Sequence, residues 1–180
     1  MTELIKTISS FELKVLDFVS NYFSNPVFDA FMPIISATCN PGEIWIVLAL
    51  TMLFFKKTRK AGFAVIISLI IGYLVGNMTL KPLIARVRPF EISAIELIIN
   101  PPTDFSFPSG HTLASFESAF AINFYNKKFG KYAFILASVI AFSRLYLYVH
   151  YPTDIIFAII LGLLISILSK KLTDKLVIIK

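Results

Sequence analysis

Two histidines, an aspartate and several basic residues lie at defined spacings in an otherwise mostly apolar chain of 180 residues. They fall in three short segments, which are KPLIARVRP at 81–89, PSGH at 108–111 and SRLYLYVHYPTD at 143–154. Basic side chains bind phosphate, and two histidines can divide the roles of nucleophile and general acid between them. The combination predicts chemistry on a phosphorylated substrate.

The third segment holds a candidate nucleophile. Pro152 suits the first turn of a new helix, so His150 should lie in the turn before that helix and Asp154 in its first turn. A carboxylate there can reach one imidazole nitrogen, fix the tautomer and leave the other nitrogen as a nucleophile. The structural alternative makes Asp154 a helix-start charge and His150 an interfacial residue.

Arg144, nearly two turns deeper in the preceding helix, needs an anion, which could be phosphate, Glu117 or Asp154.

The second segment predicts an anion site at a helix start. Ser109 can cap a helix that begins near residue 110, and Gly110 lets a ligand approach the backbone. His111 at this position could protonate a departing oxygen. A plain turn with a capping serine is the structural alternative.

The first segment places two cations seven residues apart. Lys81 and Arg88 share one face if the helix continues between them, with Pro82 at a kink or fresh turn and Pro89 at the helix end. Two cations on one face suit the several oxygens of a phosphoryl group. Arg86 points elsewhere by helical spacing, so we do not expect it to touch phosphate. The alternative for the pair is a membrane boundary, where long basic side chains reach the interface.

The composition predicts an all-α, polytopic membrane bundle. The chain is 57% hydrophobic and carries a net charge of +6, and its long apolar runs favour a membrane over nucleic acid as its surroundings. The single cysteine, Cys39, allows no intrachain disulfide. Gly72 and Gly76 predict a close helix crossing.

The six predicted spans are 27–38, 43–55, 61–80, 112–126, 132–149 and 152–168. We expect one domain, 1–180, in which residues 1–24 form an amphipathic segment at the interface.

Charge distribution predicts the topology. With six spans and a cytoplasmic N-terminus, three basic clusters fall on the cytoplasmic side, as the positive-inside rule expects. The clusters comprise Lys56, Lys57, Arg59 and Lys60; Lys127, Lys128 and Lys131; and Lys170, Lys171, Lys175 and Lys180. The three motifs then lie on the extracytoplasmic side.

Taken together, the segments resemble the signature of the type 2 phosphatidic acid phosphatase superfamily, K-x6-R-P, P-S-G-H and S-R-x5-H-x3-D. Every specified position matches, within residues 81–154: Lys81, Arg88, Pro89, Pro108, Ser109, Gly110, His111, Ser143, Arg144, His150 and Asp154. The resemblance implies that His150 attacks phosphorus and becomes a phosphohistidine, that Asp154 orients it, and that His111 protonates the leaving group. It also implies that no metal or other cofactor is needed, and that the phosphoryl oxygens are held by Lys81, Arg88, Ser109, Gly110 and Arg144.

This resemblance implies an integral lipid phosphatase of the bacterial cytoplasmic membrane. We expect undecaprenyl pyrophosphate as the substrate, with phosphatidylglycerol phosphate or phosphatidate as alternatives. The loop 90–107 carries several isoleucines that could enter the interface, while Glu91, Glu96 and Asp104 would repel further negative charge. A non-catalytic binder or transporter of anionic lipids would explain the cations but leave both histidines without a role. The sequence indicates no nucleic-acid partner and does not indicate an oligomeric state.

Overall fold

The computed structural model describes residues 3–40 and 42–176, and this part of the chain is helical with connecting loops and no strand. The all-α prediction is therefore confirmed. Residues 1–2 of the predicted interfacial segment and Lys180 of the third basic cluster lie outside the described residues.

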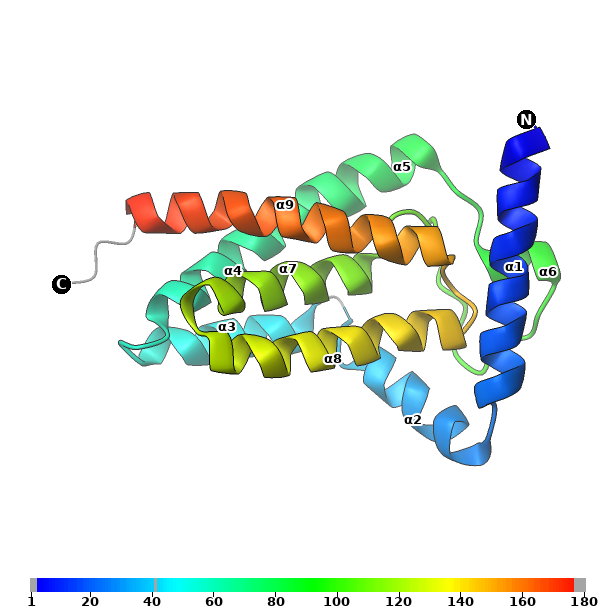
Figure 1. Ribbon diagram of the computed structural model, residues 1–180, viewed down its shortest axis with the longest axis horizontal. Coiled ribbons are helices and arrows are strands. Elements are labelled where there is room, and N and C mark those ends of the chain that lie inside the picture. Colours follow the sequence, from blue (N-terminus) through cyan, green and yellow to red (C-terminus); the bar gives the residue numbers. More distant parts are fainter. Residues whose placement is uncertain (1–2, 41, 177–180) are drawn as a thin grey trace.

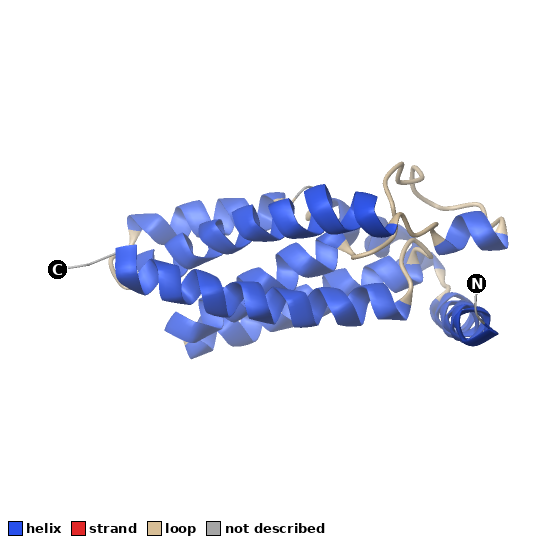
Figure 2. Ribbon diagram, turned by 90° about the horizontal axis from the view of Figure 1, so that it is seen from above, coloured by secondary structure: helices blue, strands red, loops and turns tan. Residues whose placement is uncertain are grey.

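Five helices lie side by side in a bundle (Figure 1, Figure 2). They are α3 (Glu43–Phe54), α4 (Arg59–Gly72), α7 (Gly110–Tyr125), α8 (Lys127–Tyr146) and α9 (Pro152–Leu176). Three helical stretches of the described chain, Arg59–Ser93, Lys127–Tyr146 and Pro152–Leu176, are long and apolar enough to cross a membrane. Helix α7 packs against α4, α8 and α9 and buries more than half of its residues, so it forms the centre of the bundle.

Glycines allow α4 and its extension to approach α7 closely. Helix α4 continues through the π-helical segment η1 (Tyr73–Leu80) into α5 (Lys81–Ile84). A Cβ atom at Gly76 would lie 2.5 Å from Leu113 Cδ2, and one at Gly72 would overlap the Glu117 carboxylate. The close crossing predicted from Gly72 and Gly76 is therefore present, and α7 is the partner.

The predicted helix from Lys81 to Arg88 is wrong. Ala85 adopts a left-handed conformation with φ of 48° and ends α5. Arg88 is extended, as expected of a residue before proline, and Pro89 begins α6 (Pro89–Ser93) instead of ending a helix. Arg88 therefore reaches the bundle from an extended segment rather than from the helix that carries Lys81.

The predicted side for the N-terminus is also wrong. Helix α1 (Glu3–Phe23) crosses the end of the bundle that holds the three motifs (Figure 1). Its Glu12 and Asp17 hydrogen-bond to residues on either side of the His150 turn. The basic loops between α3 and α4 and between α7 and α8 lie with the end of α9 at the opposite end, so the predicted grouping of the basic clusters holds for the described residues. The interfacial position of α1 stays a prediction.

Two short helices explain why α1 lies at the motif end of the bundle. Helix α2 (Pro26–Ala37) and α3 have 12 residues each, so each is about 18 Å long, well short of a hydrocarbon core of about 30 Å. Helix α2 runs obliquely from the motif end, where Asp29 accepts a hydrogen bond from Tyr146, toward the start of α3. Gly42, the residue before α3, packs against Ala114 and Leu69. The two helices thus traverse the bundle once, not twice, which moves the N-terminus to the motif end.

Gly62 provides a test of the packing between α3 and α4. A Cβ atom there would lie 2.7 Å from the backbone oxygen of Ala49, which cannot move without shifting α3. We expect Gly62→Ala to lower the free energy of unfolding by about 1–3 kcal/mol, as overpacking does. Thermal unfolding in detergent measures this loss. Gly76→Ala is the matched control, because it meets only the flexible end of Leu113 and should cost less. Equal midpoints for the two variants would contradict the close α3–α4 contact.

Candidate active site

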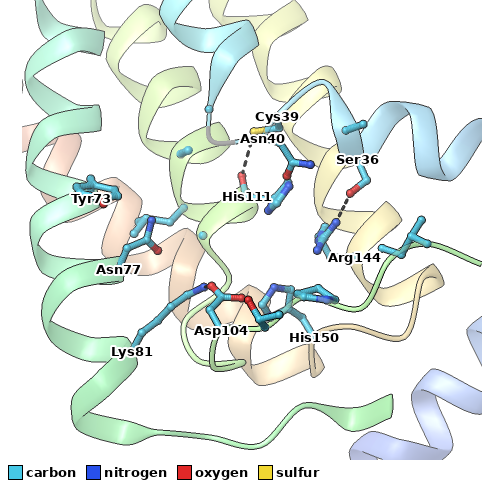
Figure 3. A pocket seen from close by; sticks show the side chains of 18 of the residues that line it. Ser36, Cys39, Asn40, Tyr73, Asn77, Lys81, Asp104, His111, Arg144 and His150 are labelled. Atoms are coloured by element: carbon cyan, nitrogen blue, oxygen red, sulfur yellow. Dashed lines mark hydrogen bonds and ion pairs between the residues drawn. The ribbon is translucent and has the colours of Figure 1, made fainter. Parts of the chain in front are cut away.

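All of the predicted site residues gather at one end of the bundle. A cavity of about 1840 Å³ opens there, and Figure 3 shows His111, Arg144 and His150 around it. Six predicted residues line it, namely Lys81, Arg88, Gly110, His111, Arg144 and His150. Ser109 and Asp154 are fully buried beside it. The three sequence segments therefore form one site.

His150 lies in the turn between α8 and α9, where the left-handed Tyr148 reverses the chain. Its Nδ1 is 3.6 Å from Asp154 Oδ2, which is longer than a hydrogen bond, whereas its Nε2 faces Arg88 at 3.4 Å. Burial, followed by the positive charges of Arg88 and Arg144, lowers the pKa of His150 well below 6.5. The imidazole is therefore neutral near pH 7, and its Nε2 is the nitrogen on the side of Arg88.

Ser106 is a site residue that the sequence analysis missed. Its hydroxyl donates to Asp154 Oδ2 at 2.5 Å and lies 3.5 Å from Nδ1 of His150. The backbone N–H of Tyr151 donates to the same carboxylate oxygen at 2.9 Å. Asp154 is thus held in place by the loop before α7 as well as by its own helix. The only indication of this role in the sequence was a hydroxyl side chain two residues before Pro108, which is weak evidence for a site residue.

Asp104 lies between two of the cations that are predicted to bind phosphate. Its carboxylate pairs with Lys81 and with Arg88, whose Nη2 is 2.5 Å from Oδ1, although Lys81 and Arg88 come from different segments. Burial opposes ionisation of Asp104, but the hydrogen bond and charge of Lys81, together with Arg88, lower its pKa to about 2. The sequence analysis predicted that Asp104 would repel further negative charge, and it did not predict the ion pairs with Lys81 and Arg88. Asp104 is therefore the anion that these two cations bind in the structure.

Arg144 lies nearer the end of its helix than predicted. Helix α8 ends at Tyr146, so Arg144 belongs to its last turn instead of lying two turns deep. Its Nη1 donates to Ser36 of α2, and its buried Nε has no hydrogen-bond partner. No ion pair among the described residues joins Arg144 to Glu117 or Asp154, so the two structural partners considered for it are absent there. Part of its guanidinium remains available to an anion in the cavity.

Helix α7 begins at Gly110, as predicted, and presents the second histidine. The expected cap is different, because the Ser109 hydroxyl lies 3.0 Å from the Thr112 hydroxyl and makes no hydrogen bond to the helix backbone. His111 lines the cavity, and its buried Nε2 has no hydrogen-bond partner among the described residues. The two imidazoles therefore face one cavity from different elements.

One wall of the cavity is apolar. This wall is formed by α3 and by α4 with η1, through residues such as Ile46, Leu50, Ile66, Leu69, Ile70 and Leu74. The buried cations lie only at the end near His150. A cavity with one cationic end and one apolar wall suits an amphipathic ligand with an anionic head.

Comparison with known proteins agrees with the motif geometry. Residues 57–178, more than half of the chain, match the model of the PAP2 superfamily. The chain belongs to this superfamily.

Curated relatives of this PAP2 chain are named as lipid phosphatases. The undecaprenyl-diphosphatase of Sulfolobus acidocaldarius is 36% identical over 70% of this chain, and the match spans 62% of that protein, less than two thirds of its length. Undecaprenyl-diphosphatase BcrC of Bacillus subtilis is 30% identical over 83% of this chain and 77% of its own. The lipid A 4'-phosphatase of Porphyromonas gingivalis is 32% identical over 81% of this chain and 66% of its own.

Two solved structures share the fold. The crystal structure of Aquifex aeolicus LpxE has a TM-score of 0.72 at 23% identity, covering 88% of this chain and 94% of that one. The phosphatidylglycerolphosphate phosphatase from Bacillus subtilis, described as a transmembrane PAP2 type, has a TM-score of 0.71 at 24% identity, covering 99% and 90%. The helical bundle of this PAP2 chain is therefore a fold already seen in solved structures.

Asp104→Asn tests whether the carboxylate competes with phosphate for the cations. The variant keeps the shape but removes the charge, so we expect inorganic phosphate to bind at least about tenfold more tightly, equivalent to about 1.4 kcal/mol. Titration calorimetry of the detergent-solubilised protein measures the affinity. Glu91→Gln, at an exposed position in α6 that does not line the cavity, is the control. Unchanged affinity in Asp104→Asn would contradict the competition.

Proposed function

We propose that this PAP2 protein is a membrane lipid phosphatase that works through a phosphohistidine at His150 without a metal. The observation that carries the proposal is the geometry of the cavity, which brings two histidines and three buried cations together at one end of an apolar wall. The names of the relatives support the same reaction class.

The proposed reaction has two displacements at phosphorus. Nε2 of His150 attacks the terminal phosphorus, the bond from phosphorus to the lipid-side oxygen breaks, and His111 protonates that oxygen. Water, deprotonated by His111, then attacks the phosphohistidine, and the bond from phosphorus to Nε2 breaks to release inorganic phosphate. Lys81, Arg88 and Arg144 would neutralise charge on the phosphoryl oxygens, and the Gly110 N–H and Ser109 would complete their binding. Removing one such preorganised donor typically costs about 10²–10³ in rate.

Metal independence is part of this proposal. Within the described chain, no group of three or more His, Cys, Asp or Glu side chains is placed to hold a metal ion. The positive charge that a phosphoryl transfer requires is available instead from the side chains of Lys81, Arg88 and Arg144. Chelation is therefore the direct test.

Among lipid phosphates, we propose undecaprenyl pyrophosphate as the substrate, with phosphatidylglycerol phosphate or phosphatidate as alternatives. The apolar wall between α3 and α4 can accept a long chain while the head reaches His150. Two relatives are named undecaprenyl-diphosphatases, and a further one, from Bacillus subtilis, is named phosphatidylglycerophosphatase B. The substrate panel below separates these lipids.

We propose that the site faces the extracytoplasmic side of a bacterial cytoplasmic membrane. The described basic clusters lie at the end opposite the cavity, and basic loops favour the cytoplasm. With the single crossing made by α2 and α3, this orientation also places α1 on the extracytoplasmic side.

Phosphate release in EDTA tests the chemistry. We expect purified wild-type protein in detergent to hydrolyse at least one of undecaprenyl pyrophosphate, phosphatidylglycerol phosphate and phosphatidate at a rate that EDTA does not change. His150→Ala should lower turnover by at least about 10⁴, since the covalent route is lost. Colorimetric phosphate assay gives both rates.

Two outcomes would contradict the proposal. Turnover that disappears with EDTA and returns with added metal would exclude metal independence, and full activity in His150→Ala would exclude this nucleophile. A protein that binds these lipids without turnover, equally in wild type and His150→Ala, would instead be the anionic-lipid binder or transporter.

A further inference from the structure

Arg86 links two carboxylates at the edge of the active site. The sequence analysis expected it to point away from the phosphate, and it does not line the cavity. Its Nη1 is 2.6 Å from Asp154 Oδ1, and its Nη2 is 2.6 Å from Glu12 Oε2. One guanidinium therefore joins the aspartate behind His150 to the N-terminal helix.

Glu12 also binds the turn that carries His150. Its Oε1 accepts hydrogen bonds from the backbone N–H of Thr153 at 3.0 Å and from the Thr153 hydroxyl at 2.5 Å. The Glu12 side chain is 4% exposed, although it comes from a helix at the end of the bundle. Arg86 also lies over the ring of Tyr151, with 3.8 Å between its Cζ and the ring centroid. Thus α1 contacts both sides of the 150–154 turn.

The charges explain why Asp154 needs this partner. Asp154 is fully buried, and a buried carboxylate without a cation is costly. Among the described ion pairs, Arg86 is its one basic partner other than His150, and His150 is neutral in the resting protein. Ser106 and the Tyr151 N–H hold Oδ2, while Arg86 holds Oδ1. Arg86 therefore pairs with the Asp154 carboxylate and fixes its orientation beside His150.

We infer that Arg86 is a positioning residue that acts through Asp154, and that Glu12 of α1 holds Arg86 in place. Glu12 lies outside residues 57–178, so α1 adds to the catalytic apparatus a contact beyond the matched family region. The inference rests on the proposed function, because it assigns Arg86 a role in the reaction of His150.

Kinetics of single and double variants test the coupling. We expect Arg86→Gln to lower kcat about 10- to 100-fold with little change in KM, as loss of an outer partner of a reacting group typically does. Arg86→Lys should recover part of kcat, because it keeps the charge but not the fork that reaches both carboxylates. Glu12→Gln should lose less than Arg86→Gln. The Glu12→Gln/Arg86→Gln double variant should be at least as active as Arg86→Gln alone, because it removes one of two uncompensated carboxylates.

Arg59→Gln is the matched control, since Arg59 lies at the opposite end of the bundle and donates to the Leu53 carbonyl. Its kcat should equal that of wild type. Losses that multiply in the Glu12/Arg86 double variant, or a KM change without a kcat change, would overturn the inference. So would an Arg86→Gln protein with wild-type kcat.

Ring-nitrogen NMR provides a measurement that needs no turnover. The chain has two histidines, so ¹⁵N-histidine labelling in detergent gives two imidazoles, which His111→Asn assigns. We expect Arg86→Gln to shift the His150 nitrogens and leave those of His111 in place. Unchanged His150 signals would overturn the inference. If wild-type protein hydrolyses none of the lipids, the proposed function fails, and the His150 shift still decides whether Arg86 positions Asp154 against this imidazole.

Discussion

A buried excess of positive charge at one end of a helix bundle is the constraint on which the site depends. Lys81, Arg88 and Arg144 are each less than 10% exposed, and burying cations without anions costs several kcal/mol per ion. In the described chain only Asp104 lies between Lys81 and Arg88, and Arg144 has a hydroxyl partner rather than a carboxylate. A substrate phosphate can therefore supply the anion that the folded protein lacks. Burial, followed by the same positive charge, lowers the pKa of His150 and keeps its imidazole neutral.

The opposite arrangement exists a few residues away, on the Nδ1 side of His150. There the carboxylates of Glu12 and Asp154 share the single guanidinium of Arg86. Lys81, Arg88 and Arg144 thus line the cavity, whereas Glu12 and Asp154 do not, and the His150 imidazole lies between Arg88 and Asp154. This separation of charge suits an imidazole that is neutral at rest and gains a phosphoryl group during reaction. It also explains why a helix outside the bundle contacts the His150 turn.

The sequence predicted which motif residues would lie together, but not Ser106, Asp104 or every route by which the chain reaches the site. Residue types at fixed spacing predicted that His111, His150 and Asp154 would meet, and the apolar runs predicted a helical membrane bundle. The helix break at Ala85 was not predictable, because alanine is a strong helix former and its left-handed conformation depends on tertiary contacts. The contacts of Ser106 and Glu12 depend on residues 48 and 141 positions away. The N-terminus was placed on the wrong side because two 12-residue helices were counted as two crossings.

Trapping the covalent intermediate tests the central claim most directly. Wild-type protein is mixed with excess undecaprenyl pyrophosphate, quenched within milliseconds in alkali, where phosphohistidine survives, and digested for mass spectrometry. The account predicts one phosphoryl group on the peptide that contains His150, bonded through Nε2, with none on His111. The peptide should be unmodified in His150→Ala. Rapid phosphate release with no phosphorylated peptide at any quench time, or phosphorylation of His111 instead, would contradict it.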